Sequence, residues 1–276
     1  MSMKNIVSAI NRSVFSLTVL LFSATASNAQ SNDEAELAKK LSNPVAALIS
    51  VPLQFNYDGR IGPLDKGQRS TLNIQPVVPI RLNSEWNLIS RTIMPLVSQS
   101  RIFPGSGDQS GVGDITQSFF FSPSQPTASG IIWGIGPAFI LPTGSDKLLS
   151  TSQWSAGPSI VALKQTGGWT TGALVNHLWS VAETRSNSAN VNLTFVQPFV
   201  SYTTADKWTF SLNTESTYNW DSQKLSVPVN VVVSKLVRFG NQPVSLFVGA
   251  RYYAITPKSG PKGFGARAGI TFLFPT

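Results

Sequence analysis

The segment Gly263–Phe274 (GFGARAGITFLF) alternates strictly between two kinds of side chain. Its even positions, from Phe264 to Phe274, are all apolar. Its odd positions from Gly263 to Thr271 are occupied by glycines, Arg267 and Thr271. Successive side chains of a β-strand point to opposite sides of the sheet. The segment therefore predicts a strand with one apolar face and one polar face.

The same alternation recurs from Ala47 onward in about twelve segments of roughly ten to thirteen residues, each followed by a turn. These segments are 47–58, 71–82, 86–97, 113–122, 130–141, 154–164, 169–180, 190–203, 208–218, 226–238, 243–253 and 263–274. In 86–97 and 190–203 neither parity is cleanly apolar, which leaves their facing open. Strands of soluble sandwiches have about five or six residues, whereas about ten are needed to cross a bilayer at a tilt.

The connections between these segments alternate between short and long. The short ones are 83–85, 123–129, 166–168, 204–207 and 239–242, and the long ones are 59–70, 98–112, 142–153, 181–189, 219–225 and 254–262. Short periplasmic turns opposite longer extracellular loops are typical of outer-membrane barrels, and an even number of strands places both termini in the periplasm. Because lipid offers backbone groups no partner and no segment is long enough for a spanning helix, the sheet must close.

We therefore predict an all-β fold: a closed antiparallel transmembrane β-barrel of about twelve strands in the outer membrane of a Gram-negative bacterium. The barrel occupies residues 47–276. Lys4 and Arg12, the apolar run 14–22 and Ser27-Asn28-Ala29 have the features of a cleaved signal peptide over 1–29.

Residues 30–46 form a separate periplasmic segment. Acidic residues come first, from Asp33, and lysines last, at Lys39 and Lys40, which complements a helix dipole before Asn43-Pro44 ends the run. The pattern predicts a short helix on the periplasmic side or in the barrel mouth, and an unstructured linker fits the sequence equally well.

The composition limits which binding partners are expected. Charged residues make up 12%, there is no cysteine, and the net charge of +8 falls to +6 when Lys4 and Arg12 leave with the signal peptide. The remaining basic residues are dispersed singly, which is unlike a phosphate-binding surface, so we expect no nucleic-acid partner. The expected partners are outer-membrane lipid, a small-molecule solute and the barrel-assembly machinery, which reads a terminal aromatic residue such as Phe274, although Pro275-Thr276 follow it.

Aromatic residues fall at the ends of the predicted strands, where amphipathic rings favour the headgroup level. We expect Trp86, Trp169 and Trp208 at the periplasmic interface and Trp179, Tyr57, Tyr218 and Tyr252 at the opposite one. The alternative is that these side chains simply cap strands.

No arrangement of residues suggests catalysis. The only histidine, His177, shares its parity with Val175 and Trp179, and no serine stands in a recognisable catalytic motif. One histidine and scattered carboxylates offer no spacing for metal ligands. We predict no enzyme activity, no catalytic residues, no cofactor and no metal site.

The polar parity should line the lumen and is the candidate functional surface. Its predicted members are Gln54, Gln75, Arg81, Arg91, Asp114, Asn176, Asn213, Glu215, Asn230, Arg251 and Arg267. Four arginines against two carboxylates make this wall net positive, which favours anions, unless Arg–Glu pairs merely brace the lumen. On the first reading, charge reversal at Arg251 changes ion selectivity with little effect on folding. Small inner residues such as Gly134, Gly172 and Gly269 leave room for a solute, and a narrow or plugged pore is expected.

Several short motifs follow one another in the order of a known family. They are GVGDI at 111–115, QSFFFSP at 117–123, WGIGP at 133–137, LPT at 141–143, AGP at 156–158, GALVNHLWS at 172–180 and QPFVSY at 197–202. Over residues 40–276 the chain resembles the outer-membrane transporters grouped as "MetA pathway of phenol degradation", which are often mislabelled neuromedin U. The resemblance implies a porin-like channel for passive uptake of small compounds, aromatic or hydrophobic ones among them, with no catalytic residues to transfer. The alternative is a non-conducting structural or adhesion-type barrel.

Overall fold

The computed structural model describes residues 33–186 and 188–274, so the predicted signal peptide over 1–29 lies outside the described residues. Within them the chain forms β1 (Ile49–Ile61), β2 (Gly67–Ile74), β3 (Val77–Arg81), β4 (Trp86–Ser100), β5 (Asp108–Val112), β6 (Ile115–Pro123), β7 (Ile131–Leu141), β8 (Gln153–Thr166), β9 (Trp169–Glu183), β10 (Asn192–Thr203), β11 (Trp208–Thr214), β12 (Ser216–Asn219), β13 (Lys224–Phe239), β14 (Gln242–Ile255) and β15 (Gly263–Phe274). Three barrel strands are each interrupted once, giving the pairs β2 and β3, β5 and β6, and β11 and β12. The described residues therefore contain twelve barrel strands.

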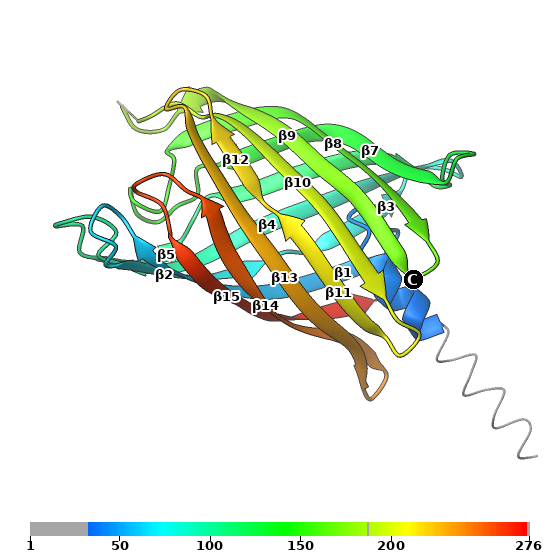
Figure 1. Ribbon diagram of the computed structural model, residues 1–276. Coiled ribbons are helices and arrows are strands. Elements are labelled where there is room, and N and C mark those ends of the chain that lie inside the picture. Colours follow the sequence, from blue (N-terminus) through cyan, green and yellow to red (C-terminus); the bar gives the residue numbers. More distant parts are fainter. Residues whose placement is uncertain (1–32, 187, 275–276) are drawn as a thin grey trace, which may run out of the picture.

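Every strand pairs antiparallel with its neighbours, and the first strand meets the last (Figure 1). In that closing pair Ile49 lies opposite Phe274 and Tyr57 lies opposite Ala266. The sheet has no free edge, so all its strands satisfy their backbone groups within the wall. The predicted closed barrel is confirmed.

The turns at the periplasmic end are tight. β8 and β9 are joined by Gly167 and Gly168, and β13 and β14 by Gly240 and Asn241. Gly167 has φ 55° and Gly240 has φ 60°. These left-handed conformations suit the two-residue turns whose twist matches that of the flanking strands, and glycine adopts them without steric cost.

The connections at the outer end are shorter than the sequence predicts. The loop expected over 59–70 is reduced to 62–66, that over 98–112 to 101–107, and that over 219–225 to 220–223. Main-chain pairing continues past the point where apolar alternation stops, because strand hydrogen bonds do not need an apolar face. The hydrophobic pattern therefore marks only the part of each strand that lies at membrane depth.

The wall has two chemically different faces. Large apolar side chains stand on the outside, among them Val231 (54% exposed), Val248 (64%) and Phe264 (76%). The opposite parity is polar and enclosed, as Asn230 (0% exposed) and Thr271 (6%) illustrate. This arrangement is the one expected of a barrel surrounded by hydrocarbon.

β4 and β10, the two strands whose facing was ambiguous, carry apolar residues on both faces. Ile89 points inward from β4, and Phe195 and Phe199 point inward from β10. All three belong to an internal cluster around Val45, which precedes β1. Alternation is blurred in these strands because their inner faces contact an apolar segment of the chain as well as the lumen.

Residues 33–41 form a short helix at the periplasmic end of the barrel (Figure 1). Ala38, Ala46 and Leu48 are buried against Leu236 and Leu273 on the inner wall. The helix and the residues after it thus enter the mouth of the barrel. No helix among the described residues is long and apolar enough to span a membrane.

Candidate functional site: the barrel lumen

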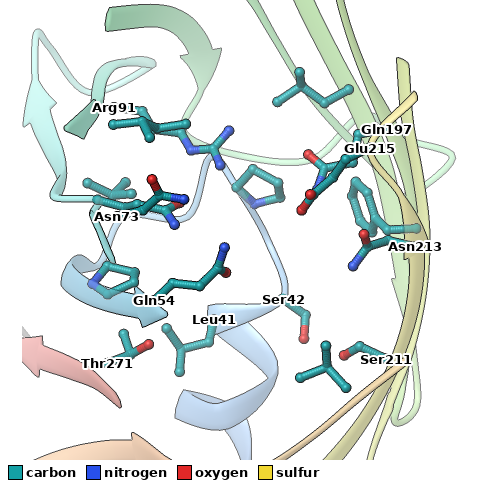
Figure 2. Close-up of a pocket in the computed structure, with 18 of the residues that line it drawn as sticks. Leu41, Ser42, Gln54, Asn73, Arg91, Gln197, Ser211, Asn213, Glu215 and Thr271 are labelled. Atoms are coloured by element: carbon teal, nitrogen blue, oxygen red, sulfur yellow. The ribbon is translucent and has the colours of Figure 1, made fainter. Parts of the chain in front are cut away.

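The lumen holds a cavity of about 620 Å³ between the inner wall and the N-terminal segment (Figure 2). Leu41, Ser42 and neighbouring residues of that segment line it from the periplasmic side. Of the side chains predicted to face the lumen, those lining this cavity are Gln54, Gln75, Arg91, Asn176, Asn213, Glu215, Arg251 and Arg267.

Asn230 lies on the inner face behind the cavity surface. Its side chain is fully buried, donates to Asn213 Oδ1 at 2.9 Å and accepts from Arg251 Nε at 2.9 Å. It supports two cavity residues and does not itself line the cavity.

Arg81 and Asp114, also predicted to face the lumen, do not line this cavity. Arg81 has the inner parity but sits exposed at the periplasmic end of β3, where its Nε donates to the carbonyl of Asn83 at 3.2 Å. Asp114 accepts hydrogen bonds from the backbone of Gly144 and from Thr151, the latter at 2.6 Å from N and 2.7 Å from Oγ1. Asp114 therefore anchors the outer loop between β7 and β8.

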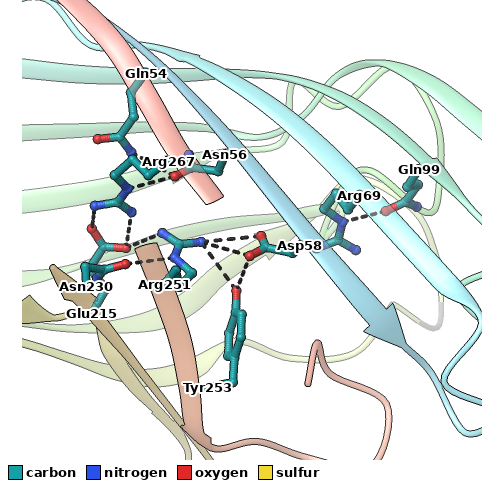
Figure 3. Close-up of polar contacts among 10 residues, drawn as sticks. All are labelled: Gln54, Asn56, Asp58, Arg69, Gln99, Glu215, Asn230, Arg251, Tyr253 and Arg267. Atoms are coloured by element: carbon teal, nitrogen blue, oxygen red, sulfur yellow. Dashed lines mark hydrogen bonds and ion pairs between the residues drawn. The ribbon is translucent and has the colours of Figure 1, made fainter. Parts of the chain in front are cut away.

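Glu215 is the centre of an ion-pair network on the inner wall (Figure 3). Arg267 binds it with both terminal nitrogens at 2.9 Å, and Arg251 Nη2 binds it at 2.7 Å. The exposed fractions of these side chains are 24% for Glu215, 10% for Arg251 and 5% for Arg267. A planar guanidinium held by both ends of a carboxylate is the strongest and most directional kind of protein ion pair.

Asp58 extends this network from β1. Arg251 Nη1 lies 3.3 Å from Asp58 Oδ2, and the hydroxyl of Tyr253 donates to Asp58 Oδ1 at 2.9 Å. Arg267 Nε also donates to Asn56 Oδ1 at 2.8 Å. Asp58 and Tyr253 are absent from the predicted lumen residues, although each continues the polar parity of its strand and could have been found by that signal.

Arg251 is not a free charge, and the effect of its charge reversal on ion selectivity stays a prediction. Its guanidinium is saturated by Asp58, Glu215 and Asn230. Reversing its charge would place two carboxylates of the network against a third. Arg251 and Arg267 brace the wall, so the second of the two readings of these arginines fits them.

Arg91 is different. It lines the cavity from β4, and its side chain makes no hydrogen bond or ion pair with another residue that the structure describes. Figure 2 shows its side chain with Asn73 on one side of the cavity and Glu215 and Gln197 on the other.

The N-terminal segment is held in the mouth by charge as well as by apolar contact. Glu34 Oε2 lies 2.7 Å from Lys207 Nζ in the turn after β10, and Glu34 Oε1 lies 2.5 Å from Arg238 Nε near the end of β13. Hydrogen bonding from Lys207, reinforced by Arg238, lowers the pKa of Glu34 below its ordinary value of 4.5. Gln165 Nε2 donates to the carbonyl of Lys39 at 3.0 Å. We call these three contacts the latch.

The inner glycines do not leave open space for a solute, contrary to expectation. A Cβ on Gly134 would stand 3.2 Å from Val45 Cγ1, one on Gly172 would stand 2.8 Å from the Phe199 ring, and one on Gly269 would stand 2.3 Å from the Phe247 ring. The missing side chains therefore make room for the N-terminal segment and for inward-pointing aromatic rings.

A second charge cluster joins two loops at the outer end. Asp65, between β1 and β2, pairs with Lys262, between β14 and β15, and lies 3.5 Å from Arg60. The hydrogen bond from Lys262 lowers the pKa of Asp65.

The predicted girdle residues stand on the outer face. Trp169 stacks on Tyr202 at 4.9 Å between ring centroids and Trp208 lies under Lys235 at 4.5 Å, both at the periplasmic end. The other predicted members make similar outward contacts: Trp86 with Trp133, Trp179 with His177, Tyr218 with Trp220, and Tyr252 with Phe264, while Tyr57 hydrogen-bonds Gln68. Trp154, which opens a predicted strand, and Trp220, which lies in the predicted loop 219–225, are exposed at 45% and 53% and are absent from the predicted girdle. Their common role at the membrane interface is a prediction.

His177 belongs to this outer face. Its Nδ1 lies 2.7 Å from Thr194 Oγ1, which also accepts from Trp220 Nε1 at 2.8 Å. No carboxylate or serine contacts the ring within the described residues. Nor do those residues contain a group of three or more His, Cys, Asp or Glu side chains placed to hold a metal ion.

Solved structures share this architecture. An outer membrane channel from Pseudomonas putida F1 superimposes with a TM-score of 0.65 at 15% identity, covering 83% of this chain and 96% of that one. The fold is that of an outer-membrane β-barrel. The KdgM porin in complex with oligogalacturonate (TM-score 0.47, 12% identity, 82% and 99% covered) and the Salmonella typhi outer membrane phospholipase dimer (TM-score 0.47, 10% identity, 82% and 90% covered) are more distant. Both of these scores are too low to support a conclusion.

No protein-family model matches the chain, and no curated protein matches it. The likeness to the solved channel therefore concerns the fold alone.

Proposed function

We propose that this barrel is a channel for the passive uptake of small solutes across the outer membrane of a Gram-negative bacterium, and that its N-terminal segment closes the periplasmic mouth. The observation that carries the proposal is the cavity of about 620 Å³ inside a closed wall. Pockets for small molecules have about 300–1,000 Å³. Barrels of about eight strands are filled by side chains and those of about sixteen leave an open channel, so a barrel of intermediate size suits a small solute.

The segment after residue 33 is the natural gate. It is part of the same chain, but its contacts with the barrel are few: the latch and two apolar clusters around Val45 and Ala38. No strand hydrogen bonds hold residues 33–48 to the wall, since β1 begins at Ile49. Releasing the segment would therefore leave the barrel wall intact.

The proposed solutes include aromatic or hydrophobic compounds. The cavity lining contains Leu174, Phe195, Phe199 and Phe247 beside its polar side chains. The resemblance of the sequence motifs to those of the "MetA pathway of phenol degradation" group points in the same direction.

Glu34→Gln is expected to increase ion conductance in planar lipid bilayers. The substitution removes the charge that holds Lys207 and Arg238, whose side chains are 27% and 37% exposed. A partly exposed pair of this kind contributes about 1–2 kcal/mol, so the open population should rise about 5- to 30-fold.

Glu36→Gln is the matched control. Glu36 is on the same helix, its side chain is 66% exposed, and its one ion pair within the described residues is with Lys39 at 3.8 Å. The conductance of Glu36→Gln should therefore equal that of the unaltered protein. If neither the unaltered protein nor Glu34→Gln conducts ions or passes solutes into liposomes, the barrel is a non-conducting structural or adhesion-type component.

The conductance of the unaltered protein should also rise in acid. Because the latch lowers the pKa of Glu34 below 4.5, its stabilisation of the closed mouth is fully present above that value and is lost as the pH falls through the lowered pKa. Glu34→Gln should show no such rise. Asp65→Asn, which removes the other titrating pair at the outer end, should keep it. An identical acid response in Glu34→Gln would show that a different group controls the mouth.

A further inference from the structure

Arg91 differs from the other arginines that line the lumen because its side chain has no ion-pair partner within the described residues. Four cationic side chains (Lys40, Arg91, Arg251 and Arg267) and two anionic ones (Asp58 and Glu215) line the cavity. The network of Figure 3 neutralises Asp58 and Glu215 with Arg251 and Arg267. Lys40 and Arg91 are then the two cations of the lining that have no ion-pair partner within the described residues, and Arg91 is the one on the barrel wall.

Amide side chains surround the cavity near Arg91. Asn73, Gln75, Asn176 and Gln197 line it, and none of them makes a side-chain hydrogen bond within the described residues. Figure 2 shows Asn73 beside Arg91 and Gln197 on the facing wall. These amides and the guanidinium of Arg91 therefore present hydrogen-bond donors to whatever occupies the cavity, either water or an acceptor group of a solute.

Apolar side chains lie on the facing wall next to these amides. On neighbouring strands Leu174 stands opposite Gln197, and Phe195 and Phe199 flank Gln197 on the same face of β10. An occupant that contacts Arg91 with an anionic group would thus place the rest of its body against Leu174 and the two rings.

We infer that the cavity is a binding site for a small organic monocarboxylate with an apolar body, anchored at Arg91. A guanidinium presents paired donors that match a carboxylate. One guanidinium without an ion pair balances one negative charge. This inference deepens the proposed channel function and rests on it for the role of the site in uptake.

Titration of the purified, detergent-solubilised protein with benzoate, followed by saturation-transfer NMR, tests the inference without any measurement of conduction. Benzoate should bind at least about tenfold more tightly than its neutral analogue benzamide, because a charge-assisted hydrogen bond is worth at least that factor. Arg91→Gln should abolish the preference for benzoate, and Arg91→Lys should keep part of it.

Arg69→Gln is the matched control. Arg69 also lies on the inner wall but outside the cavity, and its Nε donates to Gln99 Oε1 at 2.8 Å, so its removal should leave benzoate binding unchanged. Each variant is shown to be folded if its unheated sample migrates on a denaturing gel as the same compact species as the unaltered protein.

Four results would overturn the inference. The first three are no benzoate binding to the unaltered protein, equal binding of benzamide, and unchanged benzoate affinity in Arg91→Gln. Competition by chloride or inorganic phosphate at the same concentration as benzoate would also overturn it, since Arg91 would then be a general anion site. The channel proposal is tested separately. A protein that binds benzoate through Arg91 but does not conduct ions would support the binding site and contradict the channel function.

Discussion

Glu215→Gln is expected to lower the free energy of unfolding by about 3–5 kcal/mol, the largest effect of any single substitution considered. Removing this one charge leaves the guanidinium groups of Arg251 and Arg267, 10% and 5% exposed, without their common partner. Such a loss is costly because the remaining buried charges cannot recover their hydration. The measurement is urea unfolding from lipid vesicles, followed by tryptophan fluorescence, with the denaturant slope required to stay constant.

Two further variants make this result specific. Glu183→Gln removes an equivalent charge from the exposed outer end of β9 and should change the free energy of unfolding by no more than about 0.5 kcal/mol. Adding Arg267→Gln to Glu215→Gln should cost much less than Arg267→Gln costs alone, because the two side chains share one interaction. Equal costs for Glu215→Gln and Glu183→Gln would mean that the network does not stabilise the wall.

Strand alternation was sufficient to predict the barrel because it is a local signal. Side chains two residues apart share a face whatever the rest of the chain does, so segments such as Gly263–Phe274 show their two faces directly. The number of alternating segments gives the strand count, and the alternation of short and long connections indicates which ends of the strands lie in the periplasm. Closure followed from the absence of any other way to satisfy backbone groups in lipid.

The same signal gives the face of a residue but neither its height along the barrel axis nor its partner. Arg81 was assigned to the correct parity and lies at the rim. Asp58 pairs with Arg251 across 193 residues of sequence, a contact that no local pattern contains. Asp114 is a charged residue of the kind expected in the lumen, but it accepts hydrogen bonds from Gly144 and Thr151 of an outer loop. These contacts form only in the folded chain.

The apolar interior was the least predictable part of the site. Alternation cannot reveal which face of a strand meets lipid when both are apolar, as in β4 and β10. The second apolar face is explained by Val45, whose contacts with Ile89 and Phe120 exist only because the N-terminal segment enters the lumen. The sequence left open whether that segment was a helix or a linker, so its effect on the opposite wall could not be foreseen.

Val231→Arg is expected to cost about 2–4 kcal/mol of unfolding free energy in lipid vesicles. Val231 lies at the middle of β13 and is 54% exposed on the outer face. An arginine there must place its charge in the hydrocarbon or distort the bilayer to reach water, and its cost depends on depth. The same urea unfolding experiment measures it, and Val231→Leu should be nearly neutral because it preserves an apolar surface.

The inner face supplies the decisive comparison for Val231→Arg. Asn230 is unsuitable, since it is fully buried between Asn213 and Arg251 and a larger cation there would clash with the network. Ser211 of β11, which lies opposite Val232 of β13, lines the cavity. An arginine at position 211 can therefore remain hydrated. Ser211→Arg should therefore cost less than about 1 kcal/mol while altering ion selectivity. If Ser211→Arg and Val231→Arg lowered the free energy of unfolding equally, the face that carries Val231 would not contact the lipid hydrocarbon. The assignment of an outer apolar face and an inner polar face would then be wrong.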